Sequence, residues 1–157
     1  MSRILLPIAV VAALLGVASP ASASQAGRQF AVGGGEAVTG TNFGFAAHDN
    51  PQGASGFFVA TEQAPIGPGV SVAGRVTCLT VVGDRATIGI EITKSRLPYA
   101  PVGSGLFWAL VDNGPPVNGQ PVDMVEATFT STPPTTCPLL PATFLLSHGD
   151  VVVRALG

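Results

Sequence analysis

Glycine and proline interrupt this chain so often that long helices are excluded. Beyond residue 23, the longest stretch without either residue is residues 122–132, so no uninterrupted piece is longer than 11 residues. Gly and Pro weaken helix interiors, and pieces of this length are typical of strands. Most pieces are also rich in Val, Ile, Thr and Phe, which favour strands. The sequence therefore predicts an all-β protein.

Eight segments are expected to form the strands. Residues 86–93 place Ala and three Ile on one face and Thr, Gly and Glu on the other, which is typical of a half-buried strand. Residues 106–111 are apolar on both faces, which indicates a strand covered on each side. A single compact antiparallel barrel and a two-layer sandwich both provide such cover, and the sequence leaves that choice open. The expected strands are residues 29–32, 41–48, 56–61, 70–82, 86–93, 106–111, 122–130 and 151–155.

Gly83-Asp84 predicts a hairpin turn before the isoleucine-rich segment, because this pair tolerates the positive φ of tight turns. A two-residue turn would place Leu79 and Val81 beside the isoleucines, whereas a three-residue turn would place three other residues there. Those three are Val76, Cys78 and Val82. We favour the three-residue turn, since it keeps Arg75 off the core face.

The N-terminus has the pattern of a secretory signal. Arg3 precedes an apolar stretch at residues 4–17, and Ala21-Ser22-Ala23 follows as a small-x-small cleavage site. The stretch is shorter than the roughly 20 apolar residues of a membrane span. We therefore expect a signal peptide over residues 1–23 and one secreted all-β domain over residues 24–157. The mature chain is expected to be extracellular or associated with the cell wall, without membrane insertion.

Charged residues are scarce in this chain. They make up 10% of the residues, against roughly 25% in ordinary soluble domains, and the net charge is -2. This weakly acidic balance does not favour binding to nucleic acid or to an anionic membrane surface. The abundance of Ala, Gly, Val and Pro suggests a bacterial genome of high GC content.

Cys78 and Cys137 are the two cysteines of the chain. We expect them to form a disulfide, because an exported protein meets an oxidising compartment and the number of cysteines is even. Neither lies in a CxxC motif or near a histidine in the sequence, so a zinc site is not favoured.

Several short segments together resemble a family of secreted actinobacterial β-domains of unknown function, similar to post-COAP-1-type domains. The most specific of them is the segment around Cys78, residues 74–89; the others are the Gly-Gly-Gly turn at residues 33–35 and residues 42–48, 111–114, 137–138 and 149–153. The resemblance covers residues 30–155. It implies a compact β-domain outside the cell and carries no catalytic residues over.

The histidines provide the only sequence hint of catalysis or of a transition metal. A hydrolase would pair a nucleophile with a histidine base, but a GxSxG motif is absent. His48-Asp49 and His148-Gly149-Asp150 would supply metal ligands if the fold brought them together. Both segments are explained more simply as turns. We therefore assign no catalytic residue, no cofactor and no metal.

Asp112-Asn113-Gly114 and Asp123 offer oxygen ligands that would suit calcium. The spacing of a dedicated calcium loop is missing, and Asn-Gly first of all favours a turn. Whether calcium binds near Asp112 stays open at this point.

The aromatic residues are expected to be mostly internal. Trp108 lies on the segment that is apolar on both faces, which predicts a core position. Phe57 and Phe58 are adjacent and would point to opposite faces of a strand. We favour cover of both by neighbouring elements; the alternative is that one of them lies on the outside.

Residues 94–104 join two expected strands and are the candidate partner-binding loop. The residues we assign to it are Lys94, Arg96 and Tyr99. Tyr and Arg are frequent interface anchors, and the flanking Pro98 and Pro101 reduce the entropy lost on binding. The alternative is that Tyr99 folds back to cap the end of the barrel or sandwich.

The sequence favours a secreted, non-enzymatic β-domain that acts by binding or assembly at the cell envelope. The envelope or extracellular partner is not identified by any motif. The alternative is a secreted hydrolase with an unrecognised active site.

Overall fold

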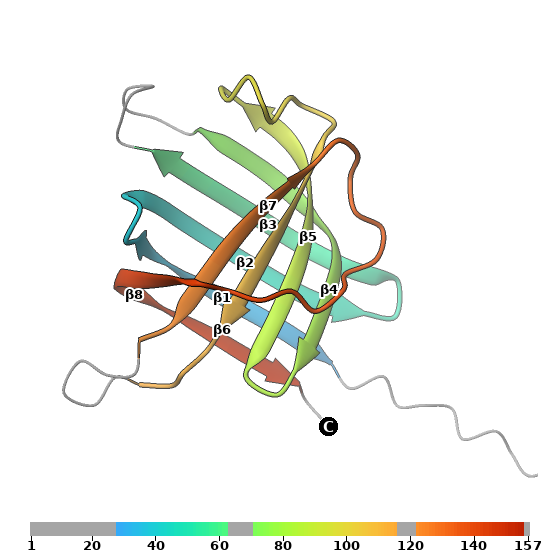
Figure 1. The fold of residues 1–157 in the computed structure, drawn as a ribbon. Coiled ribbons are helices and arrows are strands. Elements are labelled where there is room, and N and C mark those ends of the chain that lie inside the picture. Colours follow the sequence, from blue (N-terminus) through green and yellow to red (C-terminus); the bar gives the residue numbers. More distant parts are fainter. Residues whose placement is uncertain (1–27, 63–70, 116–121, 156–157) are drawn as a thin grey trace, which may run out of the picture.

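The computed structural model describes residues 28–62, 71–115 and 122–155, so the expected signal peptide over residues 1–23 lies outside the described residues. Eight antiparallel strands follow one another around a closed barrel, and β8 returns to pair with β1 (Figure 1). The strands are β1 (Gln29–Ala37), β2 (Thr41–Asn50), β3 (Gly53–Glu62), β4 (Val72–Val82), β5 (Arg85–Ser95), β6 (Gly105–Val111), β7 (Met124–Thr130) and β8 (Phe144–Ala155). The all-β prediction is confirmed, and the barrel is the architecture of the two left open by the sequence. None of the described residues belongs to a helix long and apolar enough to cross a membrane.

Alternate side chains of the strands fill the barrel interior. On β5, Ile88, Ile90 and Ile92 are each 0% exposed, which confirms the expected alternation. Burial of each such side chain contributes roughly 1.5 to 3 kcal/mol relative to exposure. The isoleucine face of β5 is therefore a main part of the core.

Residues 131–143, which we call the strap, connect β7 to β8 across the outside of the barrel (Figure 1). Cys137 of the strap lies at disulfide distance from Cys78 on β4, with 2.04 Å between the Sγ atoms. The backbone N–H of Leu140 donates to Oγ1 of Thr87 on β5 at 2.9 Å. Thr87 points away from the barrel interior and is nevertheless 0% exposed. A Cβ on Gly105 of β6 would meet Pro134 of the strap, so the strap also covers part of the outer face of β6, as the apolar sequence of that strand predicted.

The turn between β4 and β5 has two residues, because Val82 pairs with Arg85. Leu79 therefore pairs with Ile88, and Val81 faces the core. The favoured three-residue turn, which would have placed Cys78 and Val82 beside the isoleucines, is wrong.

A β-bulge between Val76 and Cys78 explains how both halves of β4 contribute to the core. The extra residue in the bulge reverses the alternation of faces along the strand. Val76 therefore also packs in the core, while Arg75 is exposed and pairs with Glu91 at 2.7 Å. The sequence argument assumed an uninterrupted alternation, and for that reason it had to choose between the two halves.

The glycine run at residues 33–35 is not a turn, in contrast to the expectation. It lies within β1, which pairs on one side with β2 and on the other with β8. A Cβ on Gly33 would lie 2.6 Å from the carbonyl oxygen of Asp150 on β8, and one on Gly35 would meet the carbonyl oxygen of His148. The glycines permit a close approach of two backbones, and β8 accordingly begins at Phe144 instead of residue 151.

Candidate functional site

Pairing between β7 and β8 closes the barrel over only part of the length of β7. These two strands share a short ladder, and the chain before β8 belongs to the strap. The rest of β7, from Glu126 to Thr130, therefore has no strand partner on this edge among the described residues. The paired residues are Met124 with Leu145 and Val125 with Phe144.

The exposure of β7 shows the consequence of this opening. Ala127 pairs with Trp108 and Phe129 pairs with Leu106, so both β7 residues occupy inward-facing positions. Inward-facing residues of a closed barrel are normally buried. Ala127 is nevertheless exposed, and Phe129 is 38% exposed. Solvent reaches the inner face of the barrel at this place.

A cavity of about 190 Å³ lies behind the opening. Most of its lining is apolar, with contributions from Phe58 and Ala60 on β3, Leu106 and Trp108 on β6, and Val125 on β7. A dry apolar cavity of about 150 Å³ is large enough to hold benzene. The barrel therefore offers space for a small apolar molecule of about one ring.

Trp108 forms part of the wall of this cavity. Its ring lies between those of Phe43 and Phe58, with a centroid distance of 5.0 Å to each, and 4% of the residue is exposed. The expected core position is confirmed. The buried Nε1–H has no hydrogen-bond acceptor among the described residues.

The other polar side chains near the cavity already have partners. Thr39 donates through Oγ1 to Oγ1 of Thr41 at 3.4 Å. Thr143 of the strap donates through Oγ1 to Oε2 of Glu126 at the opening. Ser71, which also lines the cavity, takes part in polar contacts of its own.

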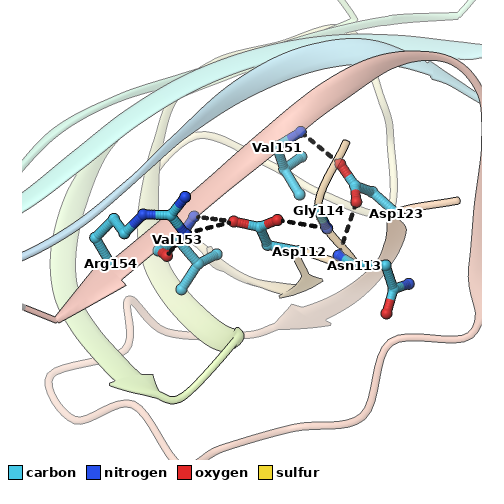
Figure 2. Close-up of polar contacts among 7 residues, drawn as sticks. All are labelled: Asp112, Asn113, Gly114, Asp123, Val151, Val153 and Arg154. Atoms are coloured by element: carbon cyan, nitrogen blue, oxygen red, sulfur yellow. Dashed lines mark hydrogen bonds and ion pairs between the residues drawn. The ribbon is translucent and has the colours of Figure 1, made fainter. Parts of the chain in front are cut away.

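Two buried carboxylates hold β8 below the opening (Figure 2). Asp123 accepts a hydrogen bond from the backbone N–H of Val151 through Oδ2 at 2.8 Å, and Asp112 accepts one from that of Val153 through Oδ2 at 2.9 Å. Val151 and Val153 are two residues apart in a strand, so their N–H groups point to the same edge. Met124, the first residue of β7, already pairs with Leu145, so that edge of β8 faces the residues that precede β7. We call Asp112 and Asp123 the carboxylate pair.

The remaining oxygens of the carboxylate pair are also engaged (Figure 2). Oδ1 of Asp123 accepts from the backbone N–H of Asn113 at 2.9 Å, and Oδ1 of Asp112 accepts from that of Gly114 at 2.9 Å. Arg154 adds an ion pair to Oδ2 of Asp112 at 3.1 Å. Burial raises the pKa of Asp123 above its ordinary value, with a further contribution from the nearby Asp150, although the backbone hydrogen bonds act in the opposite direction.

The carboxylate oxygens considered as calcium ligands thus accept hydrogen bonds from N–H groups. Nor are the two histidine segments brought together: His48 lies opposite Phe30 and His148 opposite Glu36, near the two ends of β1. Six residues of a strand span roughly 20 Å. In the part of the chain that the structure describes, no group of three or more His, Cys, Asp or Glu residues could hold a metal ion.

The candidate partner-binding loop lies beside the cavity opening. Tyr99 is 61% exposed, and its ring meets that of Phe129 edge-on at a centroid distance of 5.4 Å. Phe129 also lines the cavity. Lys94 and Arg96 are exposed.

Phe57 departs from the expectation that neighbouring elements cover both phenylalanines. Phe58 faces the core and is 1% exposed, whereas Phe57 is 56% exposed on the outer face of β3. The strap binds β4 and β5 through Cys137 and Leu140, so its described contacts do not extend to β3.

Sequence reasoning did not find the cavity. Its lining includes small inward-facing residues such as Ala60 and Ala127, but small residues also fill ordinary cores. The decisive signal would have been the early end of the ladder between β7 and β8, and a strand register of this kind is not visible in the sequence.

Comparison of the chain with models of protein families, with curated proteins and with solved structures found no match. The functional argument therefore rests on the cavity, its opening and the loop beside it. The resemblance to post-COAP-1-type domains stays a prediction.

Proposed function

We propose that this protein is a secreted, non-enzymatic domain that binds a small apolar molecule inside its barrel and acts at the cell envelope. The observation that carries the proposal is the apolar cavity of about 190 Å³ behind the opening between β7 and β8. A concave, largely apolar site with few polar groups is typical of small-molecule binding. The described residues that line it include no histidine or cysteine, which the alternative of a secreted hydrolase would call for.

A variant that fills the cavity tests the proposal. Ala60 lies on β3, faces the barrel interior and lines the cavity. Ala60→Met should therefore fill part of the cavity with a flexible side chain. Toluene is the probe, and thermal unfolding together with the fluorescence of Trp108, the single tryptophan, is the measurement. We expect toluene to raise the melting temperature of the wild type and to have a much smaller effect on Ala60→Met.

The matched control is Ala46→Met, which places the same side chain on the outer face of β2, where Ala46 is half-buried. This variant should respond to toluene like the wild type. If toluene changes neither the melting temperature nor the fluorescence of the wild type, the proposal is rejected. An equal response of Ala60→Met and Ala46→Met would place the toluene elsewhere and would also reject it.

The secreted location is a separate part of the proposal, supported by the signal-like pattern of residues 1–23. Intact-mass measurement of protein from culture medium should find a chain that begins at Ser24. Native mass spectrometry of the same sample should find a bound molecule of roughly six to ten non-hydrogen atoms. A chain that keeps its N-terminus and stays in the membrane fraction would contradict secretion.

We further propose that an envelope partner binds at Lys94, Arg96 and Tyr99. The support is their exposure and the contact of Tyr99 with Phe129 at the cavity opening. In this arrangement a partner would bind next to the point where the small molecule enters.

The double variant Arg96→Ala/Tyr99→Ala tests this loop. It should lose binding to isolated cell envelopes while its melting temperature stays close to that of the wild type. Val82→Ala, which removes an exposed side chain at the end of β4, is the control and should bind normally. Unchanged binding by the double variant, or a large fall in its stability, would reject the loop as the binding surface.

A further inference from the structure

The indole N–H of Trp108 is a buried donor that lacks an acceptor in the described structure. Buried polar groups are nearly always hydrogen-bonded, and the N–H of a buried tryptophan usually finds a partner. Leaving such a donor without an acceptor costs free energy. Trp108 is also part of the cavity wall. Its Nε1 atom is closed to solvent in this structure, so a ligand that shifts the indole ring slightly would supply the acceptor.

The remaining polar side chains of the lining point to the same residue by elimination. The hydroxyls of Thr39 and Thr41 bond to each other, and Glu126 accepts from Thr143. Ser71 has polar contacts as well. Among the described polar groups of the lining, the Nε1–H of Trp108 is therefore the donor that still lacks an acceptor, which a ligand atom would supply.

The charge of the lining excludes an anionic ligand, and a cation would lose its hydration in a mostly apolar cavity, so we take the ligand to be neutral. Glu126 lies at the opening, and the described lining residues include no Lys, Arg or His. A carboxylate or phosphate in the cavity would lose its hydration without gaining a cationic partner and would face the charge of Glu126. A neutral oxygen, as in a ketone, avoids both costs.

We infer that the cavity binds a small neutral carbonyl compound whose oxygen accepts a hydrogen bond from Nε1 of Trp108. This inference rests on the binding function proposed above and specifies the chemical class of the ligand. The volume restricts the compound to about one ring with a short substituent. Trp108 is then the residue that selects a carbonyl over a hydrocarbon of the same shape.

A matched pair of ligands isolates this hydrogen bond. Acetophenone and α-methylstyrene have the same number of non-hydrogen atoms and nearly the same shape, but only the ketone carries an acceptor oxygen. Titrations of both into the wild type and into Trp108→Phe give a double-difference cycle in which the hydration of the two ligands cancels. We expect the ratio of ketone affinity to alkene affinity to be about fivefold higher in the wild type than in Trp108→Phe.

A second measurement does not depend on the variant. Trp108 is the single tryptophan of the chain, so a nitrogen-15 NMR spectrum contains one indole Nε1–H resonance. Both ligands carry an aromatic ring and should cause similar ring-current effects. The ketone alone should add the downfield proton shift of a new hydrogen bond.

The results separate this inference from the proposed function. If both ligands bind with an unchanged affinity ratio in Trp108→Phe and shift the indole resonance alike, the inference fails while the apolar binding function stands. If neither ligand binds the wild type, the binding function fails and the inference with it. If Trp108→Phe does not fold, the resonance of the wild type decides: equal shifts reject the hydrogen bond, and a downfield shift with the ketone alone supports it.

Discussion

Asp123 accepts a hydrogen bond from the backbone N–H of Val151 at 2.8 Å, so a side chain takes the position that a strand partner would have on this edge of β8. Asp112 does the same for Val153. The carboxylate pair satisfies the edge of β8 below the place where the ladder with β7 ends. These two N–H groups of β8 therefore have acceptors although no residue of β7 lies opposite them.

Removal of the Asp123 carboxylate should destabilise the protein. Asp123→Ala leaves the N–H groups of Val151 and Asn113 without their acceptor, and each buried donor left unsatisfied costs about 1 to 3 kcal/mol. We expect the free energy of unfolding, measured with urea, to fall by about 2 to 4 kcal/mol. Asp84→Ala removes an exposed carboxylate in the β4–β5 turn and is the control. A loss no larger than that of the control would show that the carboxylate pair does not hold β8.

The stability should depend on pH through Asp123. Burial raises the pKa of Asp123 in the folded state, so the folded protein binds this proton more tightly than the unfolded chain. The resulting stabilisation is fully present below the ordinary pKa of 3.8 and is lost as the pH rises through the raised pKa. The measurement is urea unfolding of the wild type and of Asp123→Asn over this range of pH. The advantage of the wild type over Asp123→Asn should shrink as the pH rises, and an advantage that grows would contradict the prediction.

Loss of the bond between Cys78 and Cys137 should lower stability, because the crosslink closes a long loop. The two residues are 59 positions apart, for which the chain-entropy model gives about 4 kcal/mol. Cys137→Ser should therefore melt at a clearly lower temperature than the wild type. Cys78→Ser removes the same bond and should have a similar effect. Peptide mapping without reducing agent that finds both thiols free in the wild type would overturn the prediction.

Gly89 should not tolerate a side chain, because the strap packs directly on it. A Cβ at this position would lie 3.0 Å from both Sγ of Cys137 and Cβ of Pro134, and it would also meet Sγ of Cys78. Overpacking of this kind typically costs about 1 to 3 kcal/mol, which we expect for the unfolding free energy of Gly89→Ala. Gly44→Ala is the matched strand control, since its Cβ would meet one side-chain atom at 3.7 Å. Equal stability of the two variants would count against tight packing of the strap.

The sequence identified several residues of the candidate site, but it did not predict what their side chains do. The sequence indicated Asp112 and Asp123 as oxygen ligands that would suit calcium. In the structure their carboxylate oxygens instead accept hydrogen bonds from backbone N–H groups of a distant strand and of a nearby loop. Trp108 was expected in the core and lies there, but its place in a cavity wall depends on which strands border it. Such neighbours are decided by long-range pairing and not by the local pattern.

The amino-acid pattern by itself determined the strand content and the buried face of β5. Frequent Gly and Pro exclude helices, and the alternation at Ile88, Ile90 and Ile92 defines a core face, because both effects act between residues that are close in the chain. Tertiary structure alone decided that residues 33–35 continue a strand, that β4 changes face at Val76, and that β7 and β8 part early. These features arise from contacts between segments far apart in the sequence, where the register of one strand depends on its partners around the closed barrel. The cavity and its opening are consequences of that register.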